Sequence, residues 1–367
     1  MNQPFIDRHI RLFLKLFSET NKPLDLLLSQ YFRATKSLGS KDRRIMGDTI
    51  YGMIRWKSLI EFFSPADPLH FYQTIDWAEI KKDPSIPNAV KLGMPEYLYE
   101  QFCIHFGEKK ADSLGEILNR SAPTTVRVNL LKTTRDDLLQ KWKEKFSISP
   151  CGNMGIQFQK REPLFALPEF KEGLFELQDE GSQYIAEQVE ARPGQVVLDY
   201  CSGSGGKTLA FAHRLQGKGQ IYLHDVRKEA LYEARKRMKR AGIQNGQIVL
   251  DPKKLRPCDW ILLDVPCSGS GTIRRNPDHK WKINHEMIEH LSSLQKNIIK
   301  KSIAYLKPGG RLVYATCSLL PQENEHQVEY ILKNFPLTLE KEPTLLLPKE
   351  GGMDGFFCAT FKMVVLL

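Results

Sequence analysis

The chain has 367 residues, which is enough for two or three domains of ordinary size. Hydrophobic residues make up 41% of it and aromatic residues 10%, as in folded proteins, and this argues against extensive disorder. The 53 basic and 43 acidic residues give a net charge of +10, which favours a polyanionic partner such as a nucleic acid. Apolar runs fall short of the ~20 residues that span a bilayer, so we expect a cytoplasmic protein without a membrane anchor.

Residues 1–115 show apolar side chains at three-and-four spacing, which predicts an N-terminal all-α domain. Residues 116–178 differ: TVRVN alternates like a strand, and a helix follows whose expected capping box joins Thr134 and Asp137. Short strand candidates continue up to LFELQ. We therefore predict a small α+β unit for this second range.

In residues 179–367, strands alternate with helices. The predicted strands are QVVLD (195–199), QIYLHD (220–225), QIVLD (247–251), DWILLD (259–264) and RLVYAT (311–316). Continuous apolar runs separated by helices indicate a mostly parallel sheet that is buried on both faces. LTLEK and GFFCATFK are expected to add an antiparallel hairpin at the end of the chain.

Acidic residues close four of these strands: Asp199, Asp225, Asp251 and Asp264. Ligands of open α/β sheets bind at the carboxyl ends of the strands, where the strand order reverses. Four carboxylates facing one crevice repel one another unless they accept hydrogen bonds. This pattern predicts a ligand rich in hydroxyl and amino groups.

The loop after the first of these strands reads DYCSGSGGKT. Its glycines let the backbone approach a ligand closely. The loop matches the dinucleotide pattern GxGxxG imperfectly and lacks the first glycine of a phosphate-binding P-loop. Asp225, about 20 residues further on, suits a ribose diol in either a nicotinamide or an S-adenosylmethionine site.

Two cysteines, Cys267 and Cys317, each lie just beyond a predicted strand. A single free cysteine is most often a small buried apolar residue, but two at one functional edge favour a nucleophile. Methylation of carbon 5 of a pyrimidine requires prior addition of a nucleophile to carbon 6, and a thiol suits that step. A carboxyl such as Asp264, kept protonated or sharing a proton with ring nitrogen 3, would stabilise the charge that develops on the base. The seven scattered cysteines lack a Cys-x-x-Cys pair, so no disulfide or metal is expected.

As a set, these motifs resemble those of the Sun/RsmB family of RNA (cytosine-5) methyltransferases. The resemblance rests on LDYCSGSGGKT, DVPCSGSGTIRRNPDHKW, YATCSLLPQENEHQV, LKPGG and GGMDGFFCATF, and further upstream on PTTVRVNLLK, FELQDEGSQ and SKDRRIMGDTIYGMIRW. It implies an α/β Rossmann-like class I methyltransferase domain at 179–367. A small RNA-binding unit at 116–178 and a NusB-like helical RNA-binding domain at 1–115 would precede this domain.

The resemblance also implies roles for individual residues. Cys317 would be the nucleophile, Cys267 would assist product release, and Asp264 would lie near both the base and the cofactor. S-adenosylmethionine would be bound by Cys201, Ser202, Gly203, Ser204, Gly205, Gly206, Lys207, Asp225, Asp251 and Asp264. Ser202-Gly203-Ser204 departs from the Ala-Ala-Pro of the family, which bears on cofactor affinity more than on the reaction.

The implied partner is bacterial 16S ribosomal RNA, bound by a monomer. Basic residues in or beside the segments expected to face RNA are Arg127, Lys132, Arg274, Arg275 and Lys280. Trp281 is expected to be a core anchor, and the basic run 227–240 a solvated helix face outside the site. Two alternatives remain open, a nicotinamide-dependent oxidoreductase and a non-catalytic RNA-binding or ribosome assembly factor on a methyltransferase fold.

Overall fold

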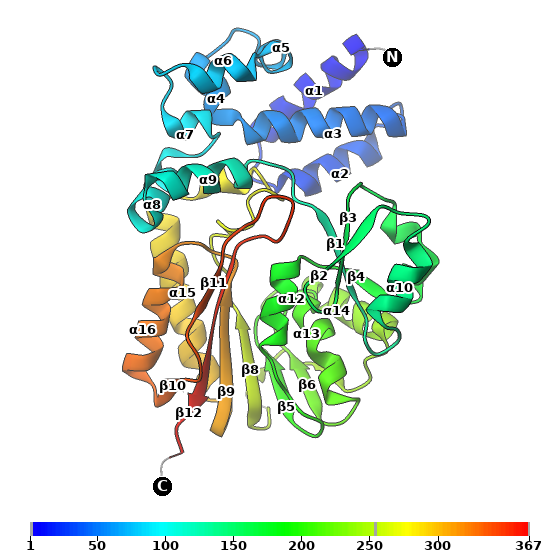
Figure 1. The fold of residues 1–367 in the computed structure, drawn as a ribbon, viewed down its shortest axis with the longest axis vertical. Helices are drawn as coiled ribbons and strands as arrows, with labels where there is room; N and C mark the ends of the chain where they lie inside the picture. The colour runs from blue at the N-terminus through cyan, green and yellow to red at the C-terminus, as the bar shows by residue number, and fades with distance from the viewer. Residues whose placement is uncertain (1–2, 253–254, 366–367) are drawn as a thin grey trace. The chain divides into compact units, whose positions relative to one another are not determined.

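The computed structural model describes residues 3–252 and 255–365 (Figure 1). The chain divides into two compact units. The helical unit comprises Met1–Ser121 and Thr272–Met287, and the sheet unit comprises Ala122–Gly271 and Ile288–Leu367. These units differ from the three ranges expected from the sequence, because the small α+β region groups with the large sheet and a segment after Cys267 groups with the helices.

The helical unit is built on amphipathic helices. They are α1 (Gln3–Ser18), α2 (Leu24–Ala34), α3 (Ser40–Arg55), α4 (Lys57–Phe63), α5 (Pro68–Thr74), α6 (Trp77–Lys82), α7 (Asn88–Lys91), α8 (Glu96–Phe106) and α9 (Glu108–Leu118). Ile6, Ile10 and Phe13 lie on one face of α1 and are fully buried. They share a core with Met46 and Ile50 of α3, which confirms the predicted helical spacing.

The segment Thr272–Met287 belongs to the helical unit because its side chains bond to that unit's backbone. Trp281 donates its indole N–H to the carbonyl oxygen of Ile54 at 2.7 Å, which makes it the anchor that we expected. Lys280, 1% exposed, donates to the carbonyl oxygens of Arg55 and Gly93 and to Asn119 Oδ1. Burial lowers the pKa of Lys280 well below its ordinary value.

The small α+β region contains a four-stranded antiparallel sheet in the order β2-β3-β1-β4. Its elements are β1 (Thr124–Val128), α10 (Arg135–Trp142), β2 (Ile148–Cys151), β3 (Gly155–Phe158), η1 (Leu164–Ala166), α11 (Pro168–Lys171) and β4 (Phe175–Leu177). The capping box of Thr134 and Asp137 is present at the start of α10. Trp142 at the end of that helix packs edge-on against Phe175, which holds the helix to the sheet.

The large sheet has the strand order β10-β12-β9-β8-β5-β6-β7, with β11 paired to β12. Its strands are β5 (Val196–Asp199), β6 (Gln220–Leu223), β7 (Gly246–Ile248), β8 (Cys258–Asp264), β9 (Leu306–Thr316), β10 (Leu337–Leu339), β11 (Thr344–Leu346) and β12 (Phe356–Met363). The five strands from β5 to β9 are parallel, whereas β10 and β12 run antiparallel, as the sequence predicted.

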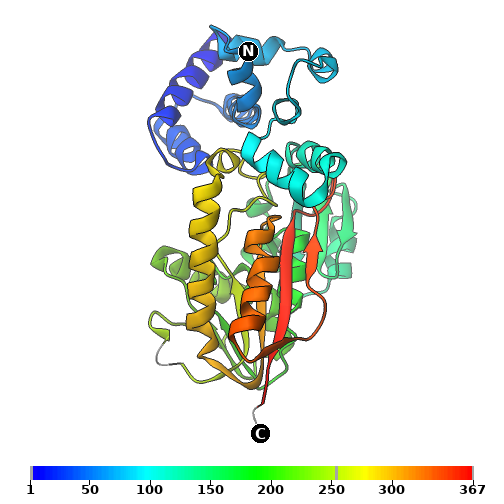
Figure 2. The same cartoon turned by 90° about the vertical axis from the view of Figure 1, so that its left-hand side faces the viewer.

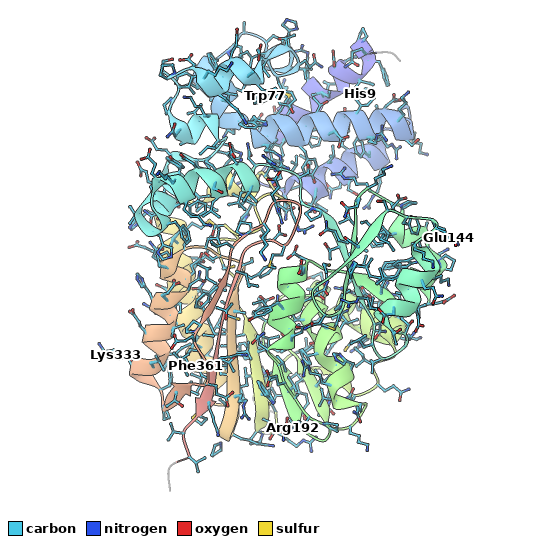
Figure 3. The ribbon with its side chains drawn as sticks, viewed as in Figure 1. His9, Trp77, Glu144, Arg192, Lys333 and Phe361 are labelled. Carbon is cyan, nitrogen blue, oxygen red and sulfur yellow. The ribbon has the colours of Figure 1, made fainter. Side chains whose placement is uncertain are left out.

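Helices cover both faces of this sheet (Figures 1 and 2). They are α12 (Glu180–Glu187), α13 (Gly206–Phe211), α14 (Lys228–Ala241), α15 (His285–Ile303) and α16 (Glu325–Asn334), with the short turns η2 (Ala212–Leu215), η4 (His279–Lys282) and η5 (Pro321–Glu323). Successive residues of β5 point to opposite sides: Val197 packs with α13 and α14, and Leu198 with α15 and α16. Figure 3 shows Lys333 projecting outward from α16, whereas Phe361 on β12 is fully buried.

The strand order reverses at β5, which pairs with β6 on one side and with β8 on the other. Because all these strands are parallel, their carboxyl ends meet at one edge. Asp199 ends β5 and Asp264 ends β8, so the two carboxylates lie at the reversal point. This edge is where the sequence predicted the ligand crevice.

Candidate active site

A cavity of about 760 Å³ opens at this edge of the sheet unit. That volume is within the usual range for a small-molecule site. The residues that line it include most of those predicted for the site, namely Cys201, Ser202, Gly203, Ser204, Gly206, Lys207, Asp225, Asp264, Cys267 and Cys317. The structure therefore brings the glycine loop and both cysteines together in one cleft.

Two residues predicted to bind the cofactor, Gly205 and Asp251, are not among the lining residues. Gly205 has a φ of +79°, and a Cβ there would lie 3.3 Å from Cβ of Ala234, so the glycine allows the loop to pack against α14. Asp251 is exposed and lies beyond the end of β7 at Ile248. The expectation that these two line the cofactor site is not met.

The glycine loop is held to the end of the second parallel strand by Asp225, which is 7% exposed. Its Oδ2 accepts the backbone N–H of Gly203 at 2.8 Å, and its Oδ1 accepts the N–H of Arg227 at 2.8 Å. Burial raises the pKa of Asp225, but the hydrogen bonds from Arg227 and Gly203 outweigh it and leave the pKa below its ordinary value. Asp225 is thus an anionic hydrogen-bond acceptor in the lining of the cleft.

Replacing Asp225 should weaken cofactor binding. We expect Asp225→Ala to raise the Kd for S-adenosylmethionine about 10- to 100-fold, because a charged hydrogen bond contributes roughly 1.5–3 kcal/mol. Isothermal titration calorimetry measures this directly. Glu229→Ala, an exposed carboxylate in the first turn of α14, is the matched control and should bind like the wild type. An unchanged Kd in the Asp225 variant would remove this residue from the site.

Two buried polar atoms in the wall of the cleft lack a hydrogen-bond partner among the described residues. They are Ser202 Oγ and Gln178 Oε1. Unpaired buried polar atoms are costly, and a bound ligand rich in donors would satisfy them. Together with Asp225, they fit a nucleoside that carries hydroxyl and amino groups.

Lys207, which is buried, and Asp264, which is half-buried, form an ion pair in the lining of the site. Burial lowers the pKa of Lys207, but the charge of Asp264 and the hydrogen bond to it outweigh this effect, so the pKa is raised. Negative charge on Cys317 raises the Lys207 pKa further. The sequence analysis expected an Asp264 that is protonated or shares a proton with ring nitrogen 3 of the base. In the structure its carboxylate oxygen accepts a hydrogen bond from the Lys207 ammonium.

The two cysteines lie in direct contact. Their Sγ atoms are 3.3 Å apart, and the backbone N–H of Cys317 donates to Cys267 Sγ at 3.3 Å. The contact with Cys317, followed by burial, raises the pKa of Cys267 well above its ordinary value. Cys267 therefore retains its proton. Because a neighbouring cation favours a thiolate, the ammonium of Lys207 favours ionisation of Cys317.

The sequence analysis did not identify Glu323, which belongs to a hydrogen-bond network that connects the loop after Cys267 with the loop after Cys317. Its carboxylate is completely buried and accepts the N–H of Ser268 at 2.9 Å, the hydroxyl of Ser268 at 2.5 Å and the amide of Gln295 at 3.0 Å. The Ser268 hydroxyl also contacts that of Ser318 at 3.2 Å. The residues that follow Cys267 and Cys317 are thus held in one network. In the sequence, Glu323 is indistinguishable from an ordinary acidic residue near a helix start.

The buried carboxylate of Asp199 gives a testable pH dependence. Burial raises its pKa to about 7, a hydrogen bond from Thr208 opposes this, and Asp264 adds to it. The folded-state pKa of Asp199 lies above the unfolded value of about 3.9. The contribution of this residue to the free energy of unfolding is therefore greatest below pH 4 and decreases as the pH rises to 7. The advantage of Asp199→Asn over wild type should therefore grow by about 2–3 kcal/mol between pH 5 and pH 8. Urea unfolding at both pH values tests this, and a pH-independent difference would contradict it.

Three of the basic residues predicted to contact RNA are buried. Arg127, Arg274 and Lys280 are each 2% exposed or less, and burial lowers the pKa of Arg127 to about 9. Lys132 is exposed, but its ammonium donates to the carbonyl oxygens of Glu172 and Arg240. Basic residues can be held by internal acceptors, so the expectation of direct RNA contact fails for the three buried ones.

Two arginines of the basic run 227–240 line the cleft, although the sequence analysis left this run outside the site. Arg227 pairs with Asp225, and Arg237 donates to Ser204 Oγ at 2.6 Å and to Glu176 at 3.1 Å. The apolar face of the helix is buried as predicted. The error arose because long arginine side chains extend past the edge of the helix that carries them.

The strand order, the glycine loop at the reversal point and the cleft define a Rossmann-like methyltransferase. The chain matches the family described as 16S rRNA methyltransferase RsmB/F over residues 186–362. It also matches the ferredoxin-like domain of RsmF/B-like methyltransferases over residues 94–162. The chain belongs to the RsmB/F methyltransferase family.

Curated relatives support this assignment. Ribosomal RNA small subunit methyltransferase B of Pseudomonas putida is 32% identical over 302 residues, which are 77% of this chain and 68% of that protein. The Vibrio vulnificus protein of that name is 34% identical over 289 residues, covering 74% and 67%. A probable member from Synechocystis is 32% identical over 296 residues, covering 73% and 66%. The chain therefore spans about two thirds of the length of these relatives.

Solved structures show the same fold. A methyltransferase homologue from Pyrococcus horikoshii superposes with a TM-score of 0.68 at 29% identity, covering 77% of this chain and all of that one. The crystal structure of PH0851 has a TM-score of 0.80 at 22% identity and covers 96% of both chains. Among the described residues, no helix is both long and apolar enough to traverse a bilayer, and no group of His, Cys, Asp or Glu is arranged to hold a metal ion.

Proposed function

We propose that this protein methylates carbon 5 of a cytosine in RNA, with S-adenosylmethionine as methyl donor and Cys317 as nucleophile. The observation that carries the proposal is the pair of thiols 3.3 Å apart in a cleft that also holds the Lys207–Asp264 ion pair. Methylation of an amino group needs neither thiol. The description of the matched family and the names of the curated relatives favour 16S ribosomal RNA of the small subunit as the substrate.

The cofactor fits the residues that line the cleft. Asp225 would accept the ribose hydroxyls, and Ser202 and Gln178 hold unpaired polar atoms for the rest of the nucleoside. When bound, S-adenosylmethionine supplies an electrophilic methyl group. Enclosing the reacting groups in the cleft strengthens their electrostatic interactions and limits access by water.

The chemistry begins at Cys317. Its thiolate, favoured by the nearby Lys207 ammonium, adds to carbon 6 of the cytosine, and the electrons of the ring double bond move toward carbon 5 and the ring. Asp264, hydrogen-bonded to Lys207, would hold the base and share a proton with ring nitrogen 3, which stabilises the developing charge. Carbon 5 would then take the methyl group as the methyl–sulfur bond of the cofactor breaks, which leaves S-adenosylhomocysteine.

Release requires transfer of the proton on carbon 5 to a water molecule in the cleft, and the electron pair left behind re-forms the ring double bond as the bond between carbon 6 and the Cys317 sulfur breaks. Cys267 keeps its proton and lies next to that sulfur, so its S–H can donate a hydrogen bond to the departing thiolate. This assigns Cys317 to addition and Cys267 to release. Arg275, half-buried in the segment after the Cys267 loop, stays a candidate contact for RNA.

The experiment that tests this function is transfer of a tritiated methyl group to 16S ribosomal RNA, followed by nucleoside analysis. We expect the label in 5-methylcytidine. A label in another nucleoside would overturn the mechanism, and RNA binding without transfer would favour a non-catalytic binding factor. Binding of a nicotinamide cofactor in place of S-adenosylmethionine would indicate an oxidoreductase.

A further inference from the structure

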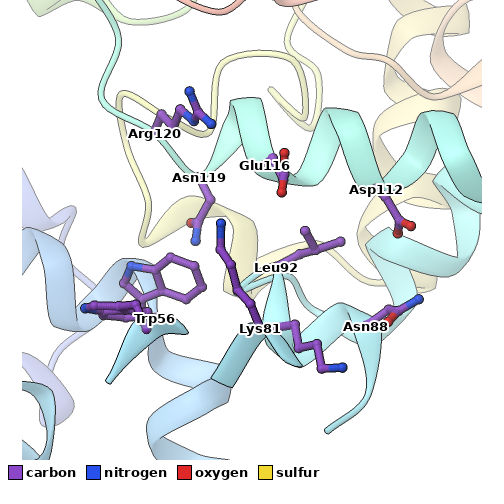
Figure 4. Close-up of a pocket in the computed structure, with 10 residues that line it drawn as sticks. Trp56, Lys81, Asn88, Leu92, Asp112, Glu116, Asn119 and Arg120 are labelled. Carbon is purple, nitrogen blue, oxygen red and sulfur yellow. The ribbon is translucent and has the colours of Figure 1, made fainter. Parts of the chain in front are cut away.

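The helical unit contains a cavity of its own, of about 480 Å³ (Figure 4). All ten of its lining residues lie within residues 56–120. They come from α6, α7 and α9 and from the residues that directly follow α3, α7 and α9, and they include aromatic, cationic and acidic side chains. Neither the proposed reaction nor the cofactor uses this cavity.

One wall of the cavity is aromatic. The rings of Trp56 and Trp77 have centroids 4.5 Å apart and are tilted by 47°, and both side chains are half-buried. Leu92 adds an apolar surface. Partly exposed aromatic rings in RNA-binding proteins provide surfaces on which unstacked bases pack. The wall therefore suits a planar ligand.

Asn119 supplies a hydrogen-bond donor beside this wall. It is 6% exposed, and its Oδ1 accepts the ammonium of Lys280 at 2.8 Å. This contact sets the orientation of the amide, because the NH₂ group cannot face an ammonium. The NH₂ group has no hydrogen-bond partner among the described residues, and Figure 4 shows the side chain directed toward Trp56. A ligand with a carbonyl or ring-nitrogen acceptor would satisfy it.

The remaining lining residues are charged. Three are cationic and two are acidic: Lys81, Lys91 and Arg120, with Asp112 and Glu116. Asp112 already accepts the hydroxyl of Tyr99 at 2.6 Å. The cations suit a phosphate group, and the carboxylate of Glu116 suits an amino group of a base.

We propose that this cavity binds an unpaired nucleotide of the substrate RNA. The base packs on Trp56 and Trp77 and accepts a hydrogen bond from Asn119, while Lys81, Lys91 and Arg120 face its phosphates. The inference rests on the proposed function insofar as RNA is the substrate. It adds a second recognition site, on the helical unit, that selects RNA with an unpaired nucleotide.

The test uses the full chain and a fluorescently labelled single-stranded RNA hexanucleotide, with binding followed by anisotropy. Asn119→Asp keeps the oxygen that accepts from Lys280 but replaces the NH₂ donor with an acceptor, and Trp77→Leu removes a stacking face. Each should raise the Kd about tenfold, since the stacking of one base and a hydrogen bond from a buried donor each contribute on that order. Lys81→Ala should reduce the log–log salt slope by about 0.7. Lys82→Ala, its exposed neighbour on α6, is the matched control and should change neither quantity.

Thermal melting shows whether the variants are folded, and Lys81→Ala keeps the test decisive should a tryptophan variant fail to fold. Wild-type Kd and salt slope in folded variants would overturn the site. Nucleoside monophosphates that bind as tightly as the hexanucleotide would overturn the assignment to RNA, and preference for an acidic peptide would do so as well. If the wild type transfers methyl groups and the variants bind RNA like the wild type, the proposed cavity is wrong and the proposed function stands. Weakened RNA binding in the variants, without any methyl transfer by the wild type, supports the cavity and counts against the proposed function.

Discussion

Cys317→Ala is expected to abolish methyl transfer and to form no covalent complex with RNA, because the other two thiols of the cleft, Cys201 and Cys267, have pKa values raised above the ordinary value and keep their protons. Cys267→Ala should still permit addition and methyl transfer but slow release. It should therefore accumulate a protein–RNA complex that survives a denaturing gel and requires S-adenosylmethionine. Both substitutions remove one sulfur atom, and the two sulfur atoms lie only 3.3 Å apart, so the variants differ little in the volume lost or in its position. Their opposite gel phenotypes would thus report chemistry and not stability.

The double variant is the control for this assignment, since the complex trapped by Cys267→Ala must disappear when Cys317 is also replaced. Cys358→Ala, a buried cysteine on β12 outside the cleft, should retain release and leave no trapped complex. A complex trapped in Cys317→Ala, with none in Cys267→Ala, would reverse the two roles.

Glu323→Ala is expected to destabilise the protein by about 2–4 kcal/mol, because it leaves buried donors of Ser268 and Gln295 unpaired and opens a void beneath the cysteine loops. Turnover should fall by more than the loss of folded protein accounts for, since the loops that carry Cys267 and Cys317 lose the hydrogen bonds that hold them in place. Urea unfolding and single-turnover methylation measure the two effects.

Glu323→Gln separates support from charge, because it keeps one acceptor oxygen for the Ser268 N–H and the Gln295 amide. It should lose less stability than the alanine variant and retain more turnover. Glu329→Ala, an exposed glutamate on α16, should change stability by no more than about 0.5 kcal/mol. A Glu323→Ala variant as stable and as active as this control would show that the network does not support the site.

Much of the site was predictable because its parts follow regular local patterns. The alternation of apolar runs and helices predicted the parallel sheet, and a parallel sheet brings its strand ends together. Asp225, Asp264, Cys267 and Cys317 were recognised because each follows a strand, and all four line the cleft. Asp251 was misplaced because β7 ends at Ile248, earlier than its apolar run suggested.

Only the tertiary structure decided how the charged residues are used. Lys280 reads as an RNA-facing lysine, yet three internal oxygens accept its ammonium and draw the segment Thr272–Met287 into the helical unit. Glu323 reads as a surface glutamate, yet it is buried beneath both cysteine loops. A sequence shows the sign of a side chain's charge and its place on a helix or strand. Whether the charge faces solvent depends on acceptors and donors supplied by distant segments, and these are fixed only when the chain folds.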